Sequence, residues 1–464
     1  MTTATFGTPT IAARLDRLPA SNFFKRLVIL ISLGGLFEFY DLFMTGYIGA
    51  GLIGAKIYSS TTPNPFDLGG FASFAGASFA GMWIGTLIFS WVSDRFGRRA
   101  AFTYSLLWYS VATLVMAFMS TAVWIDVWRL LAGIGVGVQL ITIDAYITEI
   151  TPKQSRGRYI QLTQAVTYCA VPVVALVARF AIPQVILGLD GWRWVAIVGS
   201  LGALVVWFIR ARLPESPRWL ETHGHQAEAE LVMSRMEEAV RAETGRELPP
   251  PQPLPDEAAA TKGAWTEIFS PAYRPRTIML SIFNFFQTIG FYGFAAWVPV
   301  LLLSEGITVT KSLTYVLIIA LLNPFGPLIA YSFFAEKIER KWQIVGLALI
   351  IAMCGLIWSQ MREAAGIIIL GGLITLANNA FSGAFHAYQA ELYPTRIRAQ
   401  AVGFAYSWSR FSSIFIGFAI AAALARYGVT GVFVIIAIAM VIVACVIGFF
   451  GPKTNNVRLE QLSR

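Results

Sequence analysis

Long apolar stretches alternate with short polar ones along almost the whole chain. Twelve of these stretches are about 20 residues long or longer, which in a helix is enough to cross the hydrocarbon core of a membrane. They cover residues 27–54, 70–92, 100–120, 122–149, 159–182, 193–213, 277–303, 312–335, 343–361, 364–390, 399–425 and 429–450. The pattern predicts an all-α membrane protein with twelve transmembrane helices.

A longer polar segment divides the twelve stretches into two groups of six. We therefore expect two six-helix bundles that are joined by a middle loop and flanked by two tails. The predicted units are residues 1–26 (tail), 27–213 (first bundle), 214–276 (middle loop), 277–450 (second bundle) and 451–464 (tail). Within the middle loop, residues 223–246 predict a surface helix and residues 265–269 predict a short helix at the membrane interface.

Two polar phrases occur twice at the same spacing. Ala145-Tyr146-x-x-Glu149-x-x-Pro152-x-x-x-Arg156 returns 242 residues later as Ala387-Tyr388-x-x-Glu391-x-x-Pro394-x-x-x-Arg398. The charged segment 94–99 matches the charged segment 336–341 at the same offset of 242. Two phrases in one register indicate that the whole chain is an internal duplication. A duplicated membrane bundle is typical of a secondary transporter.

Composition and charge agree with a membrane protein. Only 13% of the 464 residues are charged and mean hydropathy is +0.63, whereas a soluble domain carries about 25% charged residues. The net charge of +9 lies in short segments between apolar stretches, so we expect no nucleic-acid partner. Eleven Lys and Arg side chains in loops on one side, against five on the other, predict that the first side and both termini are cytoplasmic. The predicted location is the plasma membrane, or the inner membrane of a bacterium.

The sequence offers no catalytic chemistry. Cys169, Cys354 and Cys445 all lie in apolar stretches, and no spacing of cysteine or histidine suits a metal site. No phosphate-binding loop of a nucleotide-driven pump is present. We therefore predict no enzyme activity, no cofactor and no metal, and we expect a proton gradient to supply the energy for transport.

Several motifs resemble those of the major facilitator superfamily, over nearly the whole chain. Segment 94–99 resembles the loop between the second and third spans of that superfamily, with Ser90 where a glycine is usual. Arg129-x-x-x-Gly133-x-Gly135-x-Gly137 resembles the fourth span of its sugar-porter and metabolite-symporter branches, and segment 214–220 is similar to the segment after their sixth span. The resemblance implies a transporter that works by alternating access. We expect it to act as a monomer on a small molecule and protons.

Two features of the resemblance narrow the substrate. Glu38-Phe39-Tyr40-Asp41 looks like the acidic pair in the first span of metabolite:proton symporters. The seventh span lacks the double glutamine typical of sugar porters, and its segment 290–299 looks closer to organic-acid and organic-ion transporters. The prediction is proton-coupled uptake of a small organic acid. A sugar or polyol symporter, and a non-transporting sensor or receptor on the same scaffold, are the alternatives.

Ionisable side chains within the predicted spans point to a proton site. Such residues are rare in membranes and usually functional. Asp41 lies roughly 21 Å and Arg129 roughly 30 Å from the cytoplasmic ends of their spans, and helix tilt and the long arginine side chain reduce the difference, so the two can pair. In similar proton-coupled sugar symporters, an Asp and an Arg at these motif positions form the coupling pair. Glu38 lies three residues before Asp41 on the same helix face, and we expect it to share the proton. The alternatives are that Asp41 and Arg129 form a permanent structural ion pair, and that Glu38 faces a partner helix and accepts a hydrogen bond.

Arg410 is predicted to bind the substrate. It lies roughly 16 Å into the eleventh span, near the midplane, and the second half of the chain has no acid at matching depth. A substrate carboxylate would supply the missing charge, and organic-anion transporters of similar sequence carry an Arg in this span. Pairing with Asp41 or Glu38 is the alternative. Further polar side chains on span faces complete the expected substrate site: Asn284, Gln287, Tyr292, Gln164, Tyr168 and Asn378.

Charged residues near the cytoplasmic ends of the spans are predicted to form the inner gate. Asp144 and His386 match each other in the 242-residue register and lie about 7.5 Å from those ends, where they suit a gate or a proton exit. The others are expected to form charge pairs that close in the outward-facing state and break in the inward-facing one. They are Asp94, Arg98, Glu149, Arg156, Glu336, Arg340, Glu391 and Arg398.

Overall fold

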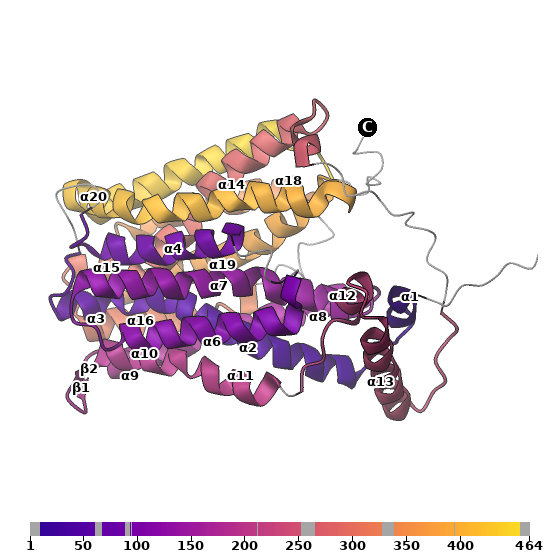
Figure 1. Ribbon diagram of the computed structural model, residues 1–464. Coiled ribbons are helices and arrows are strands. Elements are labelled where there is room, and N and C mark those ends of the chain that lie inside the picture. Colours follow the sequence, from indigo (N-terminus) through magenta and orange to yellow (C-terminus); the bar gives the residue numbers. More distant parts are fainter. Residues whose placement is uncertain are drawn as a thin grey trace, which may run out of the picture.

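A computed structural model describes residues 10–60, 67–88, 93, 95–210, 212–251, 265–326, 338–393 and 395–454. Its long helices lie side by side in two groups, one from each half of the chain (Figure 1). The first group contains α2 (Asn22–Tyr47), α3 (Gly49–Gly54), α4 (Phe71–Ile88), α6 (Arg98–Met116), α7 (Ala122–Ile150), α8 (Arg156–Tyr168), α9 (Ala170–Ala181), α10 (Gly191–Ser200) and α11 (Gly202–Arg210). The second contains α14 (Arg274–Ala295), α15 (Val298–Ser304), α16 (Val309–Ala320), α18 (Arg340–Trp358), α19 (Ala364–Glu391) and α20 (Thr395–Phe450).

Four short elements lie outside the two groups of long helices, and a small hairpin adds the β-structure. The outer elements are α1 (Ile11–Asp16), α12 (Pro217–Thr222), α13 (Gln226–Thr244) and the 3-10 helix η1 (Trp265–Phe269). Strands β1 (Val185–Ile186) and β2 (Leu189–Asp190) pair antiparallel, with Val185 opposite Asp190. The sequence pattern predicts helices only, so this hairpin is an addition. Leu187 and Gly188 form its tip, with φ of 51° and 77°.

Several predicted spans are divided or joined in the structure. The fifth is split into α8 and α9 at Cys169, close to Pro172, which has no N–H to donate. The seventh is likewise split before Pro299, at the start of α15. The last two spans run on as α20, whose backbone leaves helical geometry at Gly428 (φ 65°, ψ −165°). Among the described residues, seven helices are long and apolar enough to cross a membrane by length and composition.

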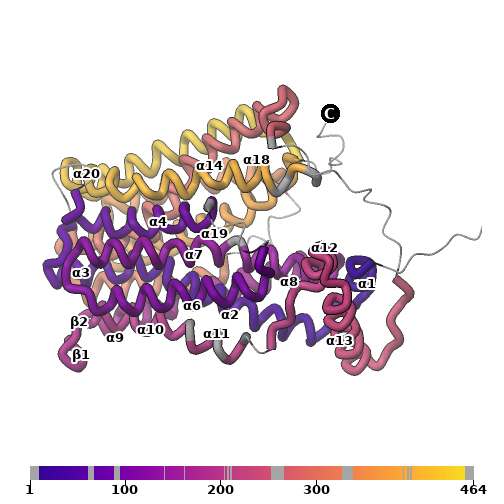
Figure 2. Tube along the Cα trace, in the orientation of Figure 1, coloured from indigo at the N-terminus to yellow at the C-terminus, as the bar shows by residue number. Residues whose placement is uncertain are grey.

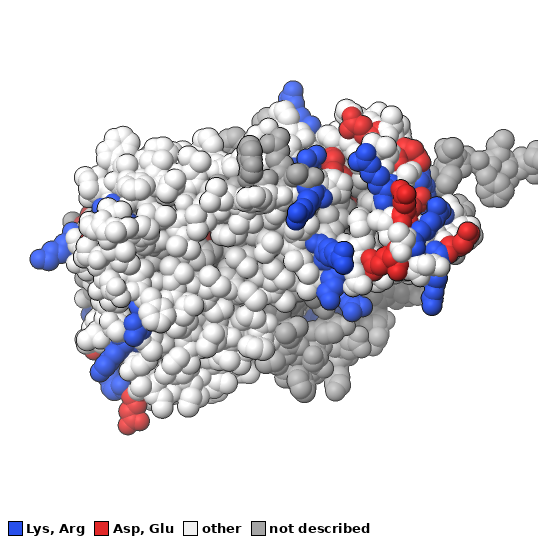
Figure 3. Space-filling view, turned by 90° about the horizontal axis from the view of Figure 1, so that it is seen from below, with Lys and Arg blue, Asp and Glu red and all other residues white. Residues whose placement is uncertain are grey.

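Charge is concentrated at the two ends of the molecule. Figure 3 shows Lys, Arg, Asp and Glu gathered mostly at one end, with an uncharged band between it and the opposite end. We call the end that carries α1, α12 and α13 the basic end, and the end that carries the β-hairpin the hairpin end (Figure 1). The uncharged band is the part of the surface that suits contact with lipid.

The internal duplication is visible in three dimensions. Arg98 pairs with Glu149 at 2.8 Å in the first half, and Arg340 pairs with Glu391 at 3.1 Å in the second. Both members of the second pair lie 242 residues after those of the first. Tyr146 and its repeat Tyr388 each donate a hydrogen bond to a proline carbonyl just beyond the last long helix of their own half.

The two halves touch closely at the hairpin end. A Cβ atom added to Gly46 on α2 would lie 2.7 Å from the Ala296 backbone, so the two backbones need a glycine there. The rings of Phe71 and Trp297 pack at 5.1 Å, and Arg179 donates to Thr314 at 2.5 Å. Toward the basic end the two groups of helices diverge (Figure 2). This arrangement is that of a bundle pair closed at the hairpin end.

The predicted N-terminal tail contains a docked helix. In α1, Arg14 donates to Glu230 at 2.5 Å and to Glu237 at 2.9 Å, both on α13. Arg17, at the end of α1, also pairs with Glu237 at 2.6 Å. Asp16 accepts from Arg218 of α12 at 2.7 Å. The helices of the middle loop are therefore fastened to the N-terminal segment and, through α2 and α7, to the first half of the chain.

Acidification is expected to release α1. Burial alone would raise the pKa of Glu237, but hydrogen bonds from Arg14 and Arg17 outweigh it and hold that pKa below its ordinary value. The stabilisation is therefore complete above the ordinary glutamate pKa and is lost as pH falls through the lower folded value. Hydrogen exchange of residues 11–17, corrected for intrinsic rates, should speed up in that acidic range. In Glu237→Gln, exchange should be fast at neutral pH as well; slow exchange there would contradict the assignment.

Candidate transport site

Asp41 and Arg129 form a buried ion pair between α2 and α7. Arg129 Nη1 lies 2.7 Å from Asp41 Oδ2, and its Nη2 donates to the Asp41 carbonyl at 2.9 Å. The two side chains are 0% and 1% exposed. Counting residues along each span predicts different membrane depths for the two Cα positions. The long arginine side chain bridges this difference in depth.

Small hydroxyl side chains complete the surroundings of this pair. Arg129 donates to Thr45 at 2.7 Å and to Ser78 at 3.1 Å, while Thr113 donates to the second carboxylate oxygen of Asp41 at 2.8 Å. Sequence reasoning did not name these three residues. Thr45 could have been identified from the sequence, because it lies four positions after Asp41 and therefore on the same helix face. Ser78 and Thr113 belong to other helices, and their sequence positions did not indicate that they lie near Asp41.

Glu38 lies near this network but outside its hydrogen bonds. Its residue surface is 1% exposed, and its Oε1 has no hydrogen-bond partner among the described residues. The hydroxyl of Tyr109 on α6 is also buried without a partner there. The structure thus gives the two acids of the first span different surroundings: Asp41 forms a salt bridge with Arg129, whereas Glu38 interacts with Arg410 only at a longer range, without a salt bridge among the described residues.

Arg410 lies buried on α20 between two tyrosines. Its Nη1 donates to the Tyr292 hydroxyl at 2.8 Å and its Nη2 to the Tyr406 hydroxyl at 3.4 Å. The guanidinium carbon also lies 5.9 Å and 5.3 Å from the centres of the same two rings. Arg410 is 4% exposed, and no carboxylate of the described residues is within salt-bridge distance of it. Tyr406 was not among the predicted residues.

Aromatic rings connect Arg410 to the first half of the chain. The Tyr292 ring lies 4.7 Å from that of Phe79 on α4. Phe291 on α14 contacts Phe43 on α2, with ring centres 6.3 Å apart. Tyr168, the repeat-related position of Arg410, packs edge-on against a ring of α2. The candidate site is therefore lined from both halves.

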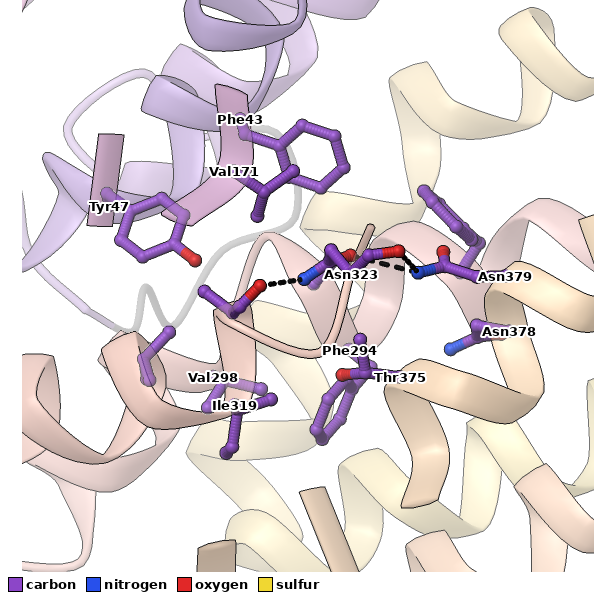
Figure 4. Close-up of a pocket in the computed structure, with 14 residues that line it drawn as sticks. Phe43, Tyr47, Val171, Phe294, Val298, Ile319, Asn323, Thr375, Asn378 and Asn379 are labelled. Atoms are coloured by element: carbon purple, nitrogen blue, oxygen red, sulfur yellow. Dashed lines mark hydrogen bonds between the residues drawn. The ribbon is translucent and has the colours of Figure 1, made fainter. Parts of the chain in front are cut away.

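A small cavity of about 40 Å³ lies between the halves (Figure 4). Rings of α2 and α14 form part of its wall, among them Phe43 and Phe294. Besides the Tyr47 hydroxyl, its polar groups are Asn323, Thr375, Asn378 and Asn379, and Asn379 donates to the Asn323 side chain at 3.1 Å. Of these four, the sequence predicted only Asn378. The other three stand out in the sequence as polar residues within apolar stretches. The neighbouring residues in the sequence do not show which way their side chains face.

The structure does not bring three predicted substrate residues to this region. Asn284 is fully buried and donates to the Leu280 carbonyl and to Gln389 at 3.1 Å, both in the second half. Gln287 is buried and Gln164 is half-buried. None of the three lines the cavity, and none is among the hydrogen-bond partners of Arg410 in the described residues, which are Tyr292 and Tyr406.

Two pairs of predicted gate residues are formed, one within each half of the chain. Arg98 contacts Glu149 and Ser93, and Arg340 contacts Glu391. Both pairs are formed in this structure, and their opening and closing during transport stays a prediction. The predicted Asp94 and Glu336, and the side chain of Arg398, lie outside the described residues. Arg156 has two buried guanidinium nitrogens without a hydrogen-bond partner among the described residues.

Glu215, from the predicted motif 214–220, caps the start of α6. Its carboxylate accepts from the backbone N–H of Arg98 at 2.9 Å and of Arg99 at 3.1 Å. Burial raises the pKa of Glu215, and the backbone N–H groups oppose that rise. Gly97 has φ of 95°, and a Cβ there would lie 2.3 Å from the Glu215 carboxylate. Sequence reasoning used this motif for recognition and missed its role as a cap.

Asp144 and His386 are both exposed. His386 Nδ1 lies 2.8 Å from the Ser382 carbonyl, and its ring lies 5.4 Å from that of Tyr406. Asp144 interacts electrostatically with Glu38 and Tyr406. The two residues therefore lie on opposite halves near Arg410, as their shared register position suggested.

Comparison with known proteins agrees with this architecture. Residues 27–464 match the family described as "Sugar (and other) transporter". The inner membrane metabolite transport protein YdjE of Escherichia coli (strain K12) is 30% identical over 459 residues, covering 98% of each chain. The niacin transporter NiaP of Acinetobacter baylyi is 28% identical over 453 residues, covering 97% of this chain and 99% of the relative. A solved D-xylose-proton symporter has a TM-score of 0.70 at 21% identity, over 94% of this chain and 99% of the other.

The matched region spans both halves of the chain, and the fold is that of the solved symporter. The predicted fold class and superfamily are thereby confirmed. The chain belongs to the sugar (and other) transporter family and is a membrane transporter of the major facilitator superfamily.

Proposed function

We propose that this protein imports a small organic acid together with protons by alternating access. The observation that carries the proposal is Arg410: a buried cation at the interface of the two halves, bonded to two tyrosine hydroxyls and to no carboxylate among the described residues. A buried charge is costly unless it is compensated. A substrate carboxylate would supply the charge and two acceptors in the geometry that a guanidinium prefers.

Asp41 is the proposed proton site and Arg129 its sensor. Protonation of Asp41 would remove the negative charge opposite Arg129 but leave the bonds of Arg129 to Thr45 and Ser78. The attraction between α2 and α7 would therefore change with the proton, while the helices stay connected. Such a change alters the relative free energies of two conformations, which is how a proton can drive reorientation.

The basic end is proposed to face the cytoplasm. Lys and Arg in short loops favour the cytoplasmic side of a membrane. The hairpin end, where the halves meet, would then face outward, and the structure would represent a conformation open to the cytoplasm. Both termini would be cytoplasmic, and bacterial relatives that are inner membrane proteins support a plasma-membrane location.

The relatives support both parts of the proposal. Niacin is a carboxylic acid, so the Acinetobacter relative carries a substrate of the proposed class. The D-xylose-proton symporter has the same fold and couples its sugar to protons. A sugar or polyol symporter is the second candidate for this chain. The cavity lined by Asn323, Thr375, Asn378 and Asn379 favours it, because amides and hydroxyls suit the hydroxyl groups of a sugar.

Uptake into proteoliposomes with an imposed pH gradient separates the two candidates. We expect carboxylates, and not sugars or polyols, to be accumulated. Arg410→Gln should lower carboxylate uptake about 100-fold or more, because charge-assisted hydrogen bonds contribute about 3 kcal/mol at the upper end of their range. Arg410→Lys should recover only part of it, since an ammonium cannot bind bidentately.

The matched control is Arg362→Gln, at an ion pair whose arginine side chain is 66% exposed. It should transport as the natural protein does, because exposed ion pairs contribute little. Accumulation of sugars without acids would overturn the carboxylate assignment and support the second candidate.

A further inference from the structure

We infer that the preferred substrate is zwitterionic: a small molecule that carries a carboxylate and a permanent or protonated nitrogen cation. The inference rests on the proposed carboxylate site at Arg410 and adds a second, negatively charged subsite formed by Glu38 and Asp144. Nothing in the proposed function requires that subsite. It follows from how the charges are distributed between the two halves of the chain.

Glu38 is a buried carboxylate whose Oε1 has no hydrogen-bond partner among the described residues. Its side chain is almost completely enclosed. Asp41, three residues away, has Arg129 as its cation, so Arg129 is not available to Glu38. Asp144 adds a second negative charge near Glu38. A buried carboxylate without a donor is a strong acceptor for a ligand cation or N–H group.

The opposite charges come from opposite halves. Arg410 lies on α20 in the second half, whereas Glu38 lies on α2 and Asp144 on α7 in the first. Glu38 interacts electrostatically with Arg410 but forms no salt bridge with it in this structure. A ligand placed between the halves would therefore meet a cation on one side and carboxylates on the other. The site has the charge pattern of a receptor for a dipolar ion.

Aromatic faces of the first half favour a cation as well. The rings of Tyr292 and Tyr406 face the Arg410 guanidinium, so the ligand cation is left to rings of the first half. Tyr168 and Phe39, with ring centres 5.3 Å apart, lie on the first half. Aromatic rings attract alkylated and aromatic nitrogen cations through their π faces. These rings suit such a cation better than a metal ion or a strongly hydrated one.

Charge balance decides between a simple anion and a zwitterion. A monoanion at Arg410 would satisfy the arginine but leave Glu38 either uncompensated or dependent on a bound proton. A zwitterion satisfies both groups at once. Its cation takes the place of the proton that Glu38 would otherwise carry.

The test compares two ligands that differ only in the cation. Pyridine-3-carboxylate is an anion at neutral pH, and its N-methyl derivative is a zwitterion with the same carboxylate and ring. Both compete against a transported carboxylate in counterflow by the full chain in proteoliposomes, without a pH gradient. We expect the N-methyl compound to compete at least tenfold better.

Glu38→Gln is expected to lower the affinity for the zwitterion about tenfold and to raise that for the anion, so that the order is reversed. Asp144→Asn should lower the ratio of zwitterion affinity to anion affinity as well, but by a smaller factor. This second variant keeps the test usable if Glu38→Gln does not fold. Arg410→Gln should lower the affinity for both ligands.

The outcomes separate this inference from the proposed function. Equal or better competition by the anion in the natural protein would overturn the zwitterion inference and leave the organic-acid proposal standing. Competition by sugars and by neither carboxylate would overturn both. A preference for the zwitterion that survives in both acid variants would show that Glu38 and Asp144 do not form the subsite.

Discussion

Asp41→Asn is expected to abolish proton-driven accumulation while leaving exchange intact. Asparagine cannot take up a proton in the working pH range, so an imposed gradient has no site through which to act. The bonds of Arg129 to Thr45 and Ser78 remain, so the helices should stay packed. In a one-to-one symporter, a gradient of about one pH unit supports about tenfold accumulation. We expect the variant to reach no accumulation in proteoliposomes, with counterflow preserved.

Asp126→Asn is the matched control. Asp126 lies three residues before Arg129 on the same helix, and it accepts a hydrogen bond from Tyr58 at 2.6 Å. No salt bridge joins it to a cation among the described residues, so its loss should not affect coupling. Accumulation by the Asp41 variant equal to that of this control would show that the proton binds elsewhere.

Gly46→Ile is expected to hold the hairpin end open. The added Cβ would lie 2.7 Å from the Cα and carbonyl oxygen of Ala296, and backbone atoms cannot give way as a flexible side chain does. Overpacking of this kind costs about 1–3 kcal/mol, which shifts the ratio of two conformations about 5- to 150-fold. Uptake should fall by a similar factor. Spin labels at Ser59 and Thr310, exposed residues near the hairpin end in opposite halves, should move apart in a cysteine-free background.

The control for this variant is Gly54→Ile. An added Cβ at Gly54, eight residues further along, has nothing within 4 Å. Its label distance and uptake should match those of the natural protein. An unchanged label distance in the Gly46 variant, with normal uptake, would mean that the contact with Ala296 is not part of the closed state.

Most of the fold could be predicted from the sequence because the membrane leaves few choices. Backbone groups in lipid must bond within their own segment, so a long apolar stretch becomes a helix. The 242-residue register then indicated the duplication, which the ion pairs of Arg98 and Arg340 show in space. The breaks at Cys169 and before Pro299 escaped the prediction, because apolar length does not show where a helix is divided.

The candidate site was predictable where charge identified it. An acid or an arginine in an apolar stretch has few possible explanations, so Asp41, Arg129 and Arg410 stood out by type alone. Neutral polar residues were harder to assign. Asn284 turned out to bond Gln389 inside the second half, whereas Asn323 and Asn379 line the cavity. A hydrogen-bonding amide serves helix packing and substrate binding equally well, and the sequence does not record which neighbour it meets.

The sequence by itself determined that this chain spans a membrane as two related halves, with Glu38, Asp41 and Arg129 in the spans of the first and Arg410 in a span of the second. The sequence also suggested the pair of Asp41 and Arg129, but only the tertiary structure decided the hydroxyl partners of Arg129, the two tyrosines that bond Arg410, and the lack of a hydrogen bond to Glu38 Oε1 among the described residues. The physical reason is one of range. The free energy of transfer into lipid depends on the composition of each segment separately. A salt bridge or hydrogen bond instead requires two atoms within about 4 Å of each other. That distance is fixed only when helices far apart in the sequence have packed.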